Sequence, residues 1–101
     1  MKELSIYKVP EDIVEKAKAE CERLKCNFVN IFRKSNEPGD KHLFVVIGEK
    51  ITPLYEDRPY CVWTFNTTDM SFHNGDYDVS DGKALSLTLH RVYNSSTFPD
   101  F

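Results

Sequence analysis

The sequence lacks most of the features that would assign it to a function class at once. It holds only 4 Gly and 5 Pro among its 101 residues, and it shows no internal repeat and no low-complexity segment. Its longest apolar run, Leu43 to Ile47, is far shorter than the roughly 18 residues that a membrane span needs. The first residues, Met1 to Ser5, contain no apolar stretch of the kind that forms a secretion signal. We therefore expect a cytoplasmic protein that does not bind a membrane.

An excess of basic charge is also absent. The 13 Lys and Arg residues against 16 Asp and Glu residues give a net charge of −3, and the isoelectric point is about 5.5. Direct nucleic-acid binding draws most of its affinity from neutralised phosphates, so this balance argues against it. The acidic excess is also too small for a protein that imitates the charge of DNA. We therefore expect a protein partner.

Cysteine is sparse, with three residues at Cys21, Cys26 and Cys61. An odd number without a secretion signal is typical of a reducing compartment, where structural disulfides rarely form. The spacing between Cys21 and Cys26 fits neither a Cys-x-x-Cys redox pair nor a zinc knuckle. We expect three free thiols, no metal and no cofactor.

The residues that are present predict one folded domain, 1–101. Hydrophobic residues make up 41% and aromatic residues 13% of the chain. This aromatic content is too high, and the net charge of the chain too low, for a disordered protein. A chain of roughly 100 residues buries about two-thirds of its unfolded surface, so a single core without disulfides is feasible.

Two segments carry the spacing of apolar residues that is typical of an amphipathic helix. In residues 10–25, Pro10 suits the first helical position, and an apolar stripe follows with spacings of 4, 4 and 3. In residues 81–93 a second stripe has spacings of 3, 1 and 3, and Ser80 before it is a natural N-cap.

Four segments are predicted strands, joined in pairs by short turns: residues 28–33, 43–47, 60–66 and 71–79. The second is continuously apolar, which indicates an interior strand that is covered on both faces or lies near a helix. In the fourth, strict alternation places Gly75 and Tyr77 on the face opposite Phe72, and a bulge at Asn74–Gly75 would shift this pattern. Residues 48–59 form the longest irregular segment.

A further short strand is expected at Leu4 to Val9, ahead of the first helix. Strands joined by short turns pair antiparallel, and two apolar helix stripes need a sheet face to cover. We therefore predict an α+β fold, an antiparallel sheet of four to five strands with two helices packed on it, in the order β-α-β-β-β-β-α.

Two constellations have some features of metal sites but fail the full requirements. Residues 76–82 begin like a calcium-binding loop, yet that loop needs Gly at its sixth position and Glu at its twelfth, where this chain has Asp and Leu. His73, Asp76 and Asp78 are suitable ligand types, but on an unbroken strand His73 points away from both aspartates. An exposed acidic strand end explains the same residues.

A cysteine nucleophile would require His42, His73 or His90 close to Cys61. Cys61 shares its strand face with two aromatic residues, which favours an inert core thiol. The chain contains no Gly-x-Ser-x-Gly, Walker, dinucleotide-binding or His-Glu-x-x-His motif. We therefore predict a protein that is not an enzyme. The alternative is a small enzyme or small-molecule binder with a site around Cys61 and His73.

Aromatic and acidic residues gather in the second hairpin and in the segment before it. Some of the aromatic residues between Tyr55 and Tyr77 must be core, while others can form an exposed patch that anchors a protein partner. The predicted contacts are the side chains that would meet a basic partner surface: Glu56, Asp57, Asp76, Tyr77, Asp78 and Asp81.

Residues 60–66, residues 72–77, Ala84 and Arg91 together resemble a pattern found in small uncharacterised bacterial proteins of phages and conjugative elements. The pattern is a Val-Trp strand, an Asn-Gly-x-Tyr strand and a helix, and it covers about a third of the chain. The chain departs from it at Asp76, where His is common, and in the small number of charges on its helix. The resemblance implies a hairpin-plus-helix fragment and a mobile-element setting, and it assigns no residue roles.

Small acidic single-domain proteins in that setting resemble anti-CRISPR proteins in size and composition. The leading hypothesis is therefore a non-enzymatic cytoplasmic protein-binding module. It would inhibit a host defence complex by binding a basic surface of that nucleoprotein complex. A homodimer joined through an exposed strand edge at Leu4 to Val9 is a further alternative.

Overall fold

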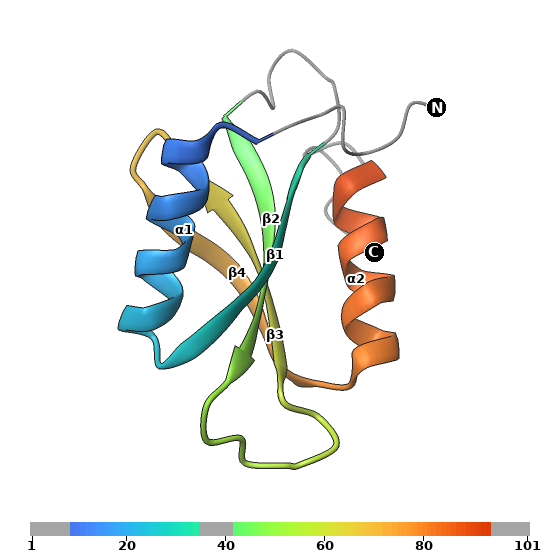
Figure 1. Ribbon diagram of the computed structural model, residues 1–101. Helices are drawn as coiled ribbons and strands as arrows, with labels where there is room; N and C mark the ends of the chain where they lie inside the picture. The colour runs from blue at the N-terminus through green and yellow to red at the C-terminus, as the bar shows by residue number, and fades with distance from the viewer. Residues whose placement is uncertain (1–8, 35–41, 94–101) are drawn as a thin grey trace.

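The computed structural model describes residues 9–34 and 42–93 and has the element order α-β-β-β-β-α (Figure 1). The predicted α+β class is confirmed. The strands form one antiparallel sheet in the order β1-β2-β3-β4. The bounds of the elements are α1 Glu11–Arg23, β1 Cys26–Arg33, β2 Leu43–Lys50, β3 Tyr60–Asn66, β4 Ser71–Val79 and α2 Asp81–Tyr93. The strand expected at Leu4 to Val9 lies outside the described residues except for Val9, which is not in a strand, and most of the turn between the first two predicted strands also lies outside them.

Helix α1 begins directly after Pro10, whose fixed φ of −56° suits the entry to a helix. The carbonyl of Pro10 accepts hydrogen bonds from the backbone N–H groups of Ile13 and Val14 at 3.0 and 3.1 Å. The helix ends before the predicted residue 25, because Lys25 adopts a left-handed φ of 63° and turns the chain into β1.

The two helices cover opposite faces of the sheet (Figure 1). On one face α1 packs over a core that includes Trp63 and Phe65 of β3. On the other face α2 packs over a smaller, aliphatic core. The buried members of the α1-side core are Ala17, Cys21, Cys26, Ile31, Phe44, Val46, Cys61, Trp63 and Phe65, and those of the α2-side core are Val45, Val62, Val79, Ala84 and Val92. Burial on both faces explains the continuous apolar run of β2.

Strand β4 contains two irregular positions that decide where its side chains point. Asn74 and Asp78 have left-handed φ values of 53° and 56°, and the β3–β4 register shifts beside each of them. The shift at Asn74 places Gly75 and Tyr77 on the α1 side, together with Phe72. The strict alternation is therefore wrong beyond this point, and the bulge at Asn74–Gly75 is confirmed.

Besides its apolar packing, helix α2 is joined to the sheet by the side chain of Arg91. The guanidinium of Arg91 donates to Thr64 Oγ1 at 2.9 Å, to Asp76 Oδ2 at 2.6 Å and to the carbonyl of Asn74. The carbonyl of Arg91 in turn accepts a 2.7 Å hydrogen bond from Nζ of Lys34, at the end of β1. At the other end of α2, Ser80 accepts a hydrogen bond from the N–H of the third helical residue, as an N-cap does.

Within residues 9–34 and 42–93, no helix is long and apolar enough to cross a membrane.

Candidate functional site

The structure places four of the six predicted contact residues at one end of the sheet. Glu56 and Asp57 lie in the loop of residues 51–59, which joins β2 to β3 (Figure 1). Asp78 and Asp81 lie at the end of β4 and the start of α2. This is the same end, because Val79 is the register partner of the first residue of β3. The loop of residues 51–59 and the end of β4 therefore both lie at the start of β3.

Asp76 and Asp78 each hold a cation of the same chain. Asp76 Oδ2 lies 2.6 Å from Nη2 of Arg91, and Asp78 Oδ1 lies 2.8 Å from Nζ of Lys50. Asp76 points to the α2 side, whereas its neighbour Tyr77 points to the α1 side and accepts a 3.1 Å hydrogen bond from the indole of Trp63. Asp76 and Tyr77 therefore cannot contribute to one flat contact surface. Both ion pairs have a role in fixing the fold.

The aromatic residues between Tyr55 and Tyr77 divide into core and surface. Trp63 and Phe65 are buried, and Phe72 packs on both, with ring centroids 4.7 and 5.3 Å away. Half-buried Tyr60 packs against the α2-side core, whereas Tyr55 and Tyr77 are exposed. The rings that can meet a partner are therefore the two tyrosines, one in the loop and one on β4.

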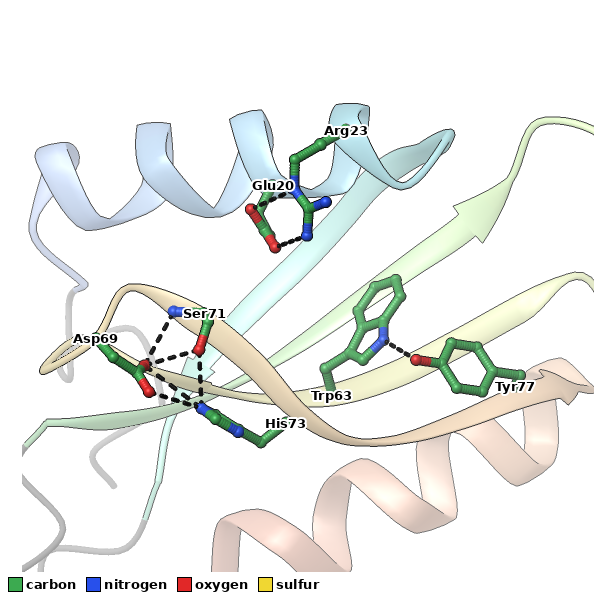
Figure 2. A network of polar contacts seen from close by, with 7 residues as sticks. All are labelled: Glu20, Arg23, Trp63, Asp69, Ser71, His73 and Tyr77. Carbon is green, nitrogen blue, oxygen red and sulfur yellow. Dashed lines mark hydrogen bonds and ion pairs between the residues drawn. The ribbon is translucent and has the colours of Figure 1, made fainter.

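A cluster of Asp69, Ser71 and His73 lies at the β3–β4 turn and was not predicted (Figure 2). Ser71 Oγ lies 2.8 Å from His73 Nε2, Asp69 Oδ2 lies 3.1 Å from the same nitrogen, and Ser71 Oγ donates to Asp69 Oδ1 at 2.8 Å. These are the residue types of a hydrolase triad. The spacing Asp-x-Ser-x-His could have revealed the cluster, because alternate residues share a strand face.

The geometry of this cluster differs from that of a catalytic triad. A triad needs the carboxylate on one ring nitrogen and the nucleophile on the other, so that the base can accept the hydroxyl proton. Here both groups meet Nε2 of His73, and the hydroxyl of Ser71 is directed to the carboxylate. The hydrogen bond from Ser71, with a further contribution from His73, lowers the pKa of Asp69. The cluster stabilises the turn.

The three thiols lie on the α1 side, in α1, β1 and β3, and all are free and buried. Burial raises the pKa of Cys21 to about 12 and that of Cys61 to about 11, and it also raises the pKa of Cys26. The thiolate is the reactive form, so these groups stay protonated and weakly nucleophilic at neutral pH.

Cys61 and His73 are not brought together. The register partner of His73 is Thr64, three residues further along β3 from Cys61. The imidazole is engaged instead with the β3–β4 turn. In the part of the chain that the structure describes, no three His, Cys, Asp or Glu side chains gather in a way that could hold a metal ion.

The loop of residues 51–59 presents apolar side chains to solvent on a fixed backbone. Ile51 is 60% exposed, Leu54 70% and Tyr55 43%. The base of the loop is closed by a 2.8 Å hydrogen bond from the N–H of Lys50 to the carbonyl of Pro59. The N–H of Ile51 donates to the turn after α1, at the carbonyl of Lys25, over 3.2 Å. The loop is thus held at both ends.

Its tip is also ordered. The N–H of Arg58 donates to the carbonyl of Tyr55 at 3.0 Å, and the guanidinium stacks over the Tyr55 ring, 4.4 Å from its centroid. Glu56 and Asp57 stand exposed between these two residues. An apolar centre with a charged border is the arrangement found in protein–protein interfaces. We name residues 51–59 the contact loop.

Comparison of the chain with protein-family models, with curated proteins and with solved structures finds no match.

Proposed function

We propose that the protein is a non-enzymatic protein-binding module and that the contact loop is its main binding surface. The observation that carries this proposal is the exposure of Ile51, Leu54 and Tyr55 on a loop that backbone hydrogen bonds hold in place. Exposed apolar side chains have an unfavourable free energy in water. Removal of their surface from water by a partner is favourable, and this drives binding.

The energetics favour such a loop as an anchor. Burying a Leu side chain contributes roughly 1.5–3 kcal/mol, and Leu54 has 70% of its surface available for this. Binding also costs conformational entropy wherever a loop must be ordered. The contact loop is ordered before binding by the hydrogen bonds at its base and by the Arg58–Tyr55 stack. Its cost of ordering is therefore small.

The charge of the surface indicates the chemistry of the partner. Glu56, Asp57 and Asp81 are exposed acids at this end of the molecule. They would meet Lys or Arg residues at the border of an apolar pocket, where charge complementarity sets orientation and association rate. Asp76 and Asp78 contribute less, because Arg91 and Lys50 already balance their charges.

A capture experiment with matched variants tests the proposal. The tagged chain is used to recover proteins from a lysate of the organism that carries the gene, beside Leu54→Asp and the control Val29→Asp. Val29 is also exposed, but it lies on β1, away from the loop. We expect a protein that the wild type and Val29→Asp recover and that Leu54→Asp loses. Equal recovery by all three would contradict the proposal.

We also propose that the partner is a host defence complex. This rests on the resemblance of the second hairpin and α2 to proteins of phages and conjugative elements, and on the small size and acidic charge. The test is phage infection of cells with an active CRISPR system. We expect the chain to restore plaque formation, and Glu56→Lys with Asp57→Lys to abolish the effect. No effect of the folded wild type would exclude that class of partner.

A further inference from the structure

Two of the three buried thiols face each other across β2. Cys26 on β1 is the register partner of Lys50, at the end of β2. Cys61 on β3 is the register partner of Gly48, two residues earlier on β2. A Cβ at position 48 would lie 3.3 Å from the Cβ of Cys26 and 2.9 Å from the ring of Trp63. The missing side chain of Gly48 therefore leaves the space in which the two thiols approach each other, within the α1-side core.

Hydrogen bonds join the two sulfurs to each other and to the backbone. The thiol of Cys61 donates to Cys26 Sγ. The thiol of Cys26 in turn donates to the carbonyl of Leu24 over 3.6 Å. Burial raises the pKa of Cys61 to about 11, and the backbone N–H of Asp78, which donates to its sulfur, acts in the opposite direction. Hydrogen bonds of this kind to the ligating sulfurs are a general feature of metal–thiolate sites.

A positive charge lies close to the pair. Burial raises the pKa of Cys26 and Cys61, and the ammonium group of Lys50 opposes this effect on both. The hydrogen bond to Asp78 raises the pKa of Lys50, so the ammonium stays charged at neutral pH. The side chain of Lys50 is 28% exposed, and Cys26 lies on the outer strand β1. The sulfurs are therefore separated from solvent by little more than one side chain.

We propose that Cys26 and Cys61 bind one Cu(I) ion as a two-coordinate bis-thiolate. Cu(I) is a soft ion that prefers thiolate ligands. Two metal–sulfur bonds of roughly 2.2 Å each span about 4.5 Å, which is close to the separation of two thiols in contact. When one Cu(I) enters, both thiol protons leave to water, and the complex carries one negative charge beside Lys50. Nothing is oxidised or reduced in this step.

The geometry favours this ion over the other fates of a thiol pair. Strands that are two apart in a sheet are separated by roughly 9–10 Å, whereas a disulfide needs Cα atoms within about 7 Å of each other. A structural zinc site needs four ligands. Among residues 9–34 and 42–93, no three His, Cys, Asp or Glu side chains gather in a way that could hold a metal ion. Linear Cu(I) coordination needs only two.

Anaerobic titration of the reduced full chain with Cu(I), in competition with the coloured chelator bicinchoninate, measures both affinity and stoichiometry. We expect one Cu(I) per chain. Cys26→Ala and Cys61→Ala should each raise the dissociation constant at least about 100-fold, because a single thiolate remains. Cys21→Ala removes the third buried thiol from the same core and should leave the constant unchanged. Equal weakening by all three variants, or a wild type that does not compete for Cu(I), would overturn the proposal.

X-ray absorption of the Cu(I)-loaded wild type tests the geometry without any substitution. Two-coordinate Cu(I) gives an intense pre-edge transition, and the fine structure should show two sulfur neighbours at roughly 2.2 Å. Three or more neighbours, or a nitrogen neighbour, would contradict the two-thiolate site.

The role of the nearby charge has a test of its own. Lys50→Gln should weaken Cu(I) binding about fivefold and leave the absorption spectrum unchanged, because it removes a charge and no ligand. The control Lys83→Gln lies on α2, on the other face of the sheet, and should have no effect. Equal affinities of Lys50→Gln and Lys83→Gln would contradict an anionic complex beside Lys50.

Discussion

Arg91 is the residue on which the attachment of α2 depends most. Its guanidinium joins the helix to Thr64 on β3 and to Asn74 and Asp76 on β4, and its side chain is only 16% exposed. Arg91→Met keeps the length and the apolar stem but removes three hydrogen bonds, one of them to a carboxylate. Asp76 is left without its cation and can turn to solvent, because 44% of its side chain is already exposed.

The expected loss of unfolding free energy follows from these exposed fractions. A charged hydrogen bond contributes about 1.5–3 kcal/mol, and loss of one member of a fully buried ion pair costs roughly 3–5 kcal/mol. Partial exposure of Asp76 screens the pair, so we expect Arg91→Met to lower the free energy of unfolding by about 2–3 kcal/mol. Asp76→Asn keeps a hydrogen-bond acceptor and should cost about 1 kcal/mol.

Urea unfolding followed by the fluorescence of Trp63 measures both changes. Trp63 is the only tryptophan in the sequence and is 2% exposed, so its emission reports loss of the core. A loss of about 2–3 kcal/mol lowers the urea midpoint by about 1–2 M for a domain of this size. The double variant should be less destabilised than the sum of the two single variants, by at least about 1 kcal/mol. Additive effects, or an unchanged midpoint for Arg91→Met, would refute the role of Arg91 in holding α2 on the sheet.

The substitution Thr88→Val and a rise in pH should also change the free energy of unfolding in defined directions. Among the described residues the buried Thr88 hydroxyl has no hydrogen-bond partner, so Thr88→Val should raise the free energy of unfolding by about 1 kcal/mol in the same urea assay. A destabilised variant would show that the hydroxyl has a partner in solution. Burial raises the pKa of Cys21 to about 12 and of Cys61 to about 11, so both thiols stay protonated in the fold above the unfolded value of about 8.5. The unfolded state then binds fewer protons, so the stability present below about pH 8.5 should fall as the pH rises towards 11, by about 2 kcal/mol per thiol at pH 10. Cys21→Ala should show a shallower fall, and an equal slope would contradict the assignment.

Much of the fold could be predicted from the sequence because periodic patterns and local signals determine it. The run from Leu43 to Ile47 has no polar alternation because helices cover both faces of β2. Residues 81–93 form α2 with the predicted bounds, since Ser80 caps the first turn and the apolar stripe from Leu85 to Val92 follows. The bounds of β3 and β4 also agree with prediction.

The candidate site was less predictable, for physical reasons. Asp76 read as an exposed acid because its partner, Arg91, lies 15 residues away and on another element. One bulge at Asn74 was enough to move Tyr77 to the opposite face. Apolar residues in a loop carry no pattern that separates an exposed Leu54 from a buried one. Exposure of the contact loop depends on where β2 ends and where β3 begins in the folded sheet, and this is a tertiary property.

The affinity of the chain for a partner recovered by capture tests the role of the contact loop most directly. Titration calorimetry should compare the wild type with Leu54→Ala and with the control Val29→Ala, each with an unchanged unfolding midpoint. Loss of the Leu54 contact, about 1.5–2 kcal/mol, predicts a dissociation constant raised about 10- to 30-fold, against no change for Val29→Ala. Equal dissociation constants for the wild type and Leu54→Ala would contradict binding through the contact loop.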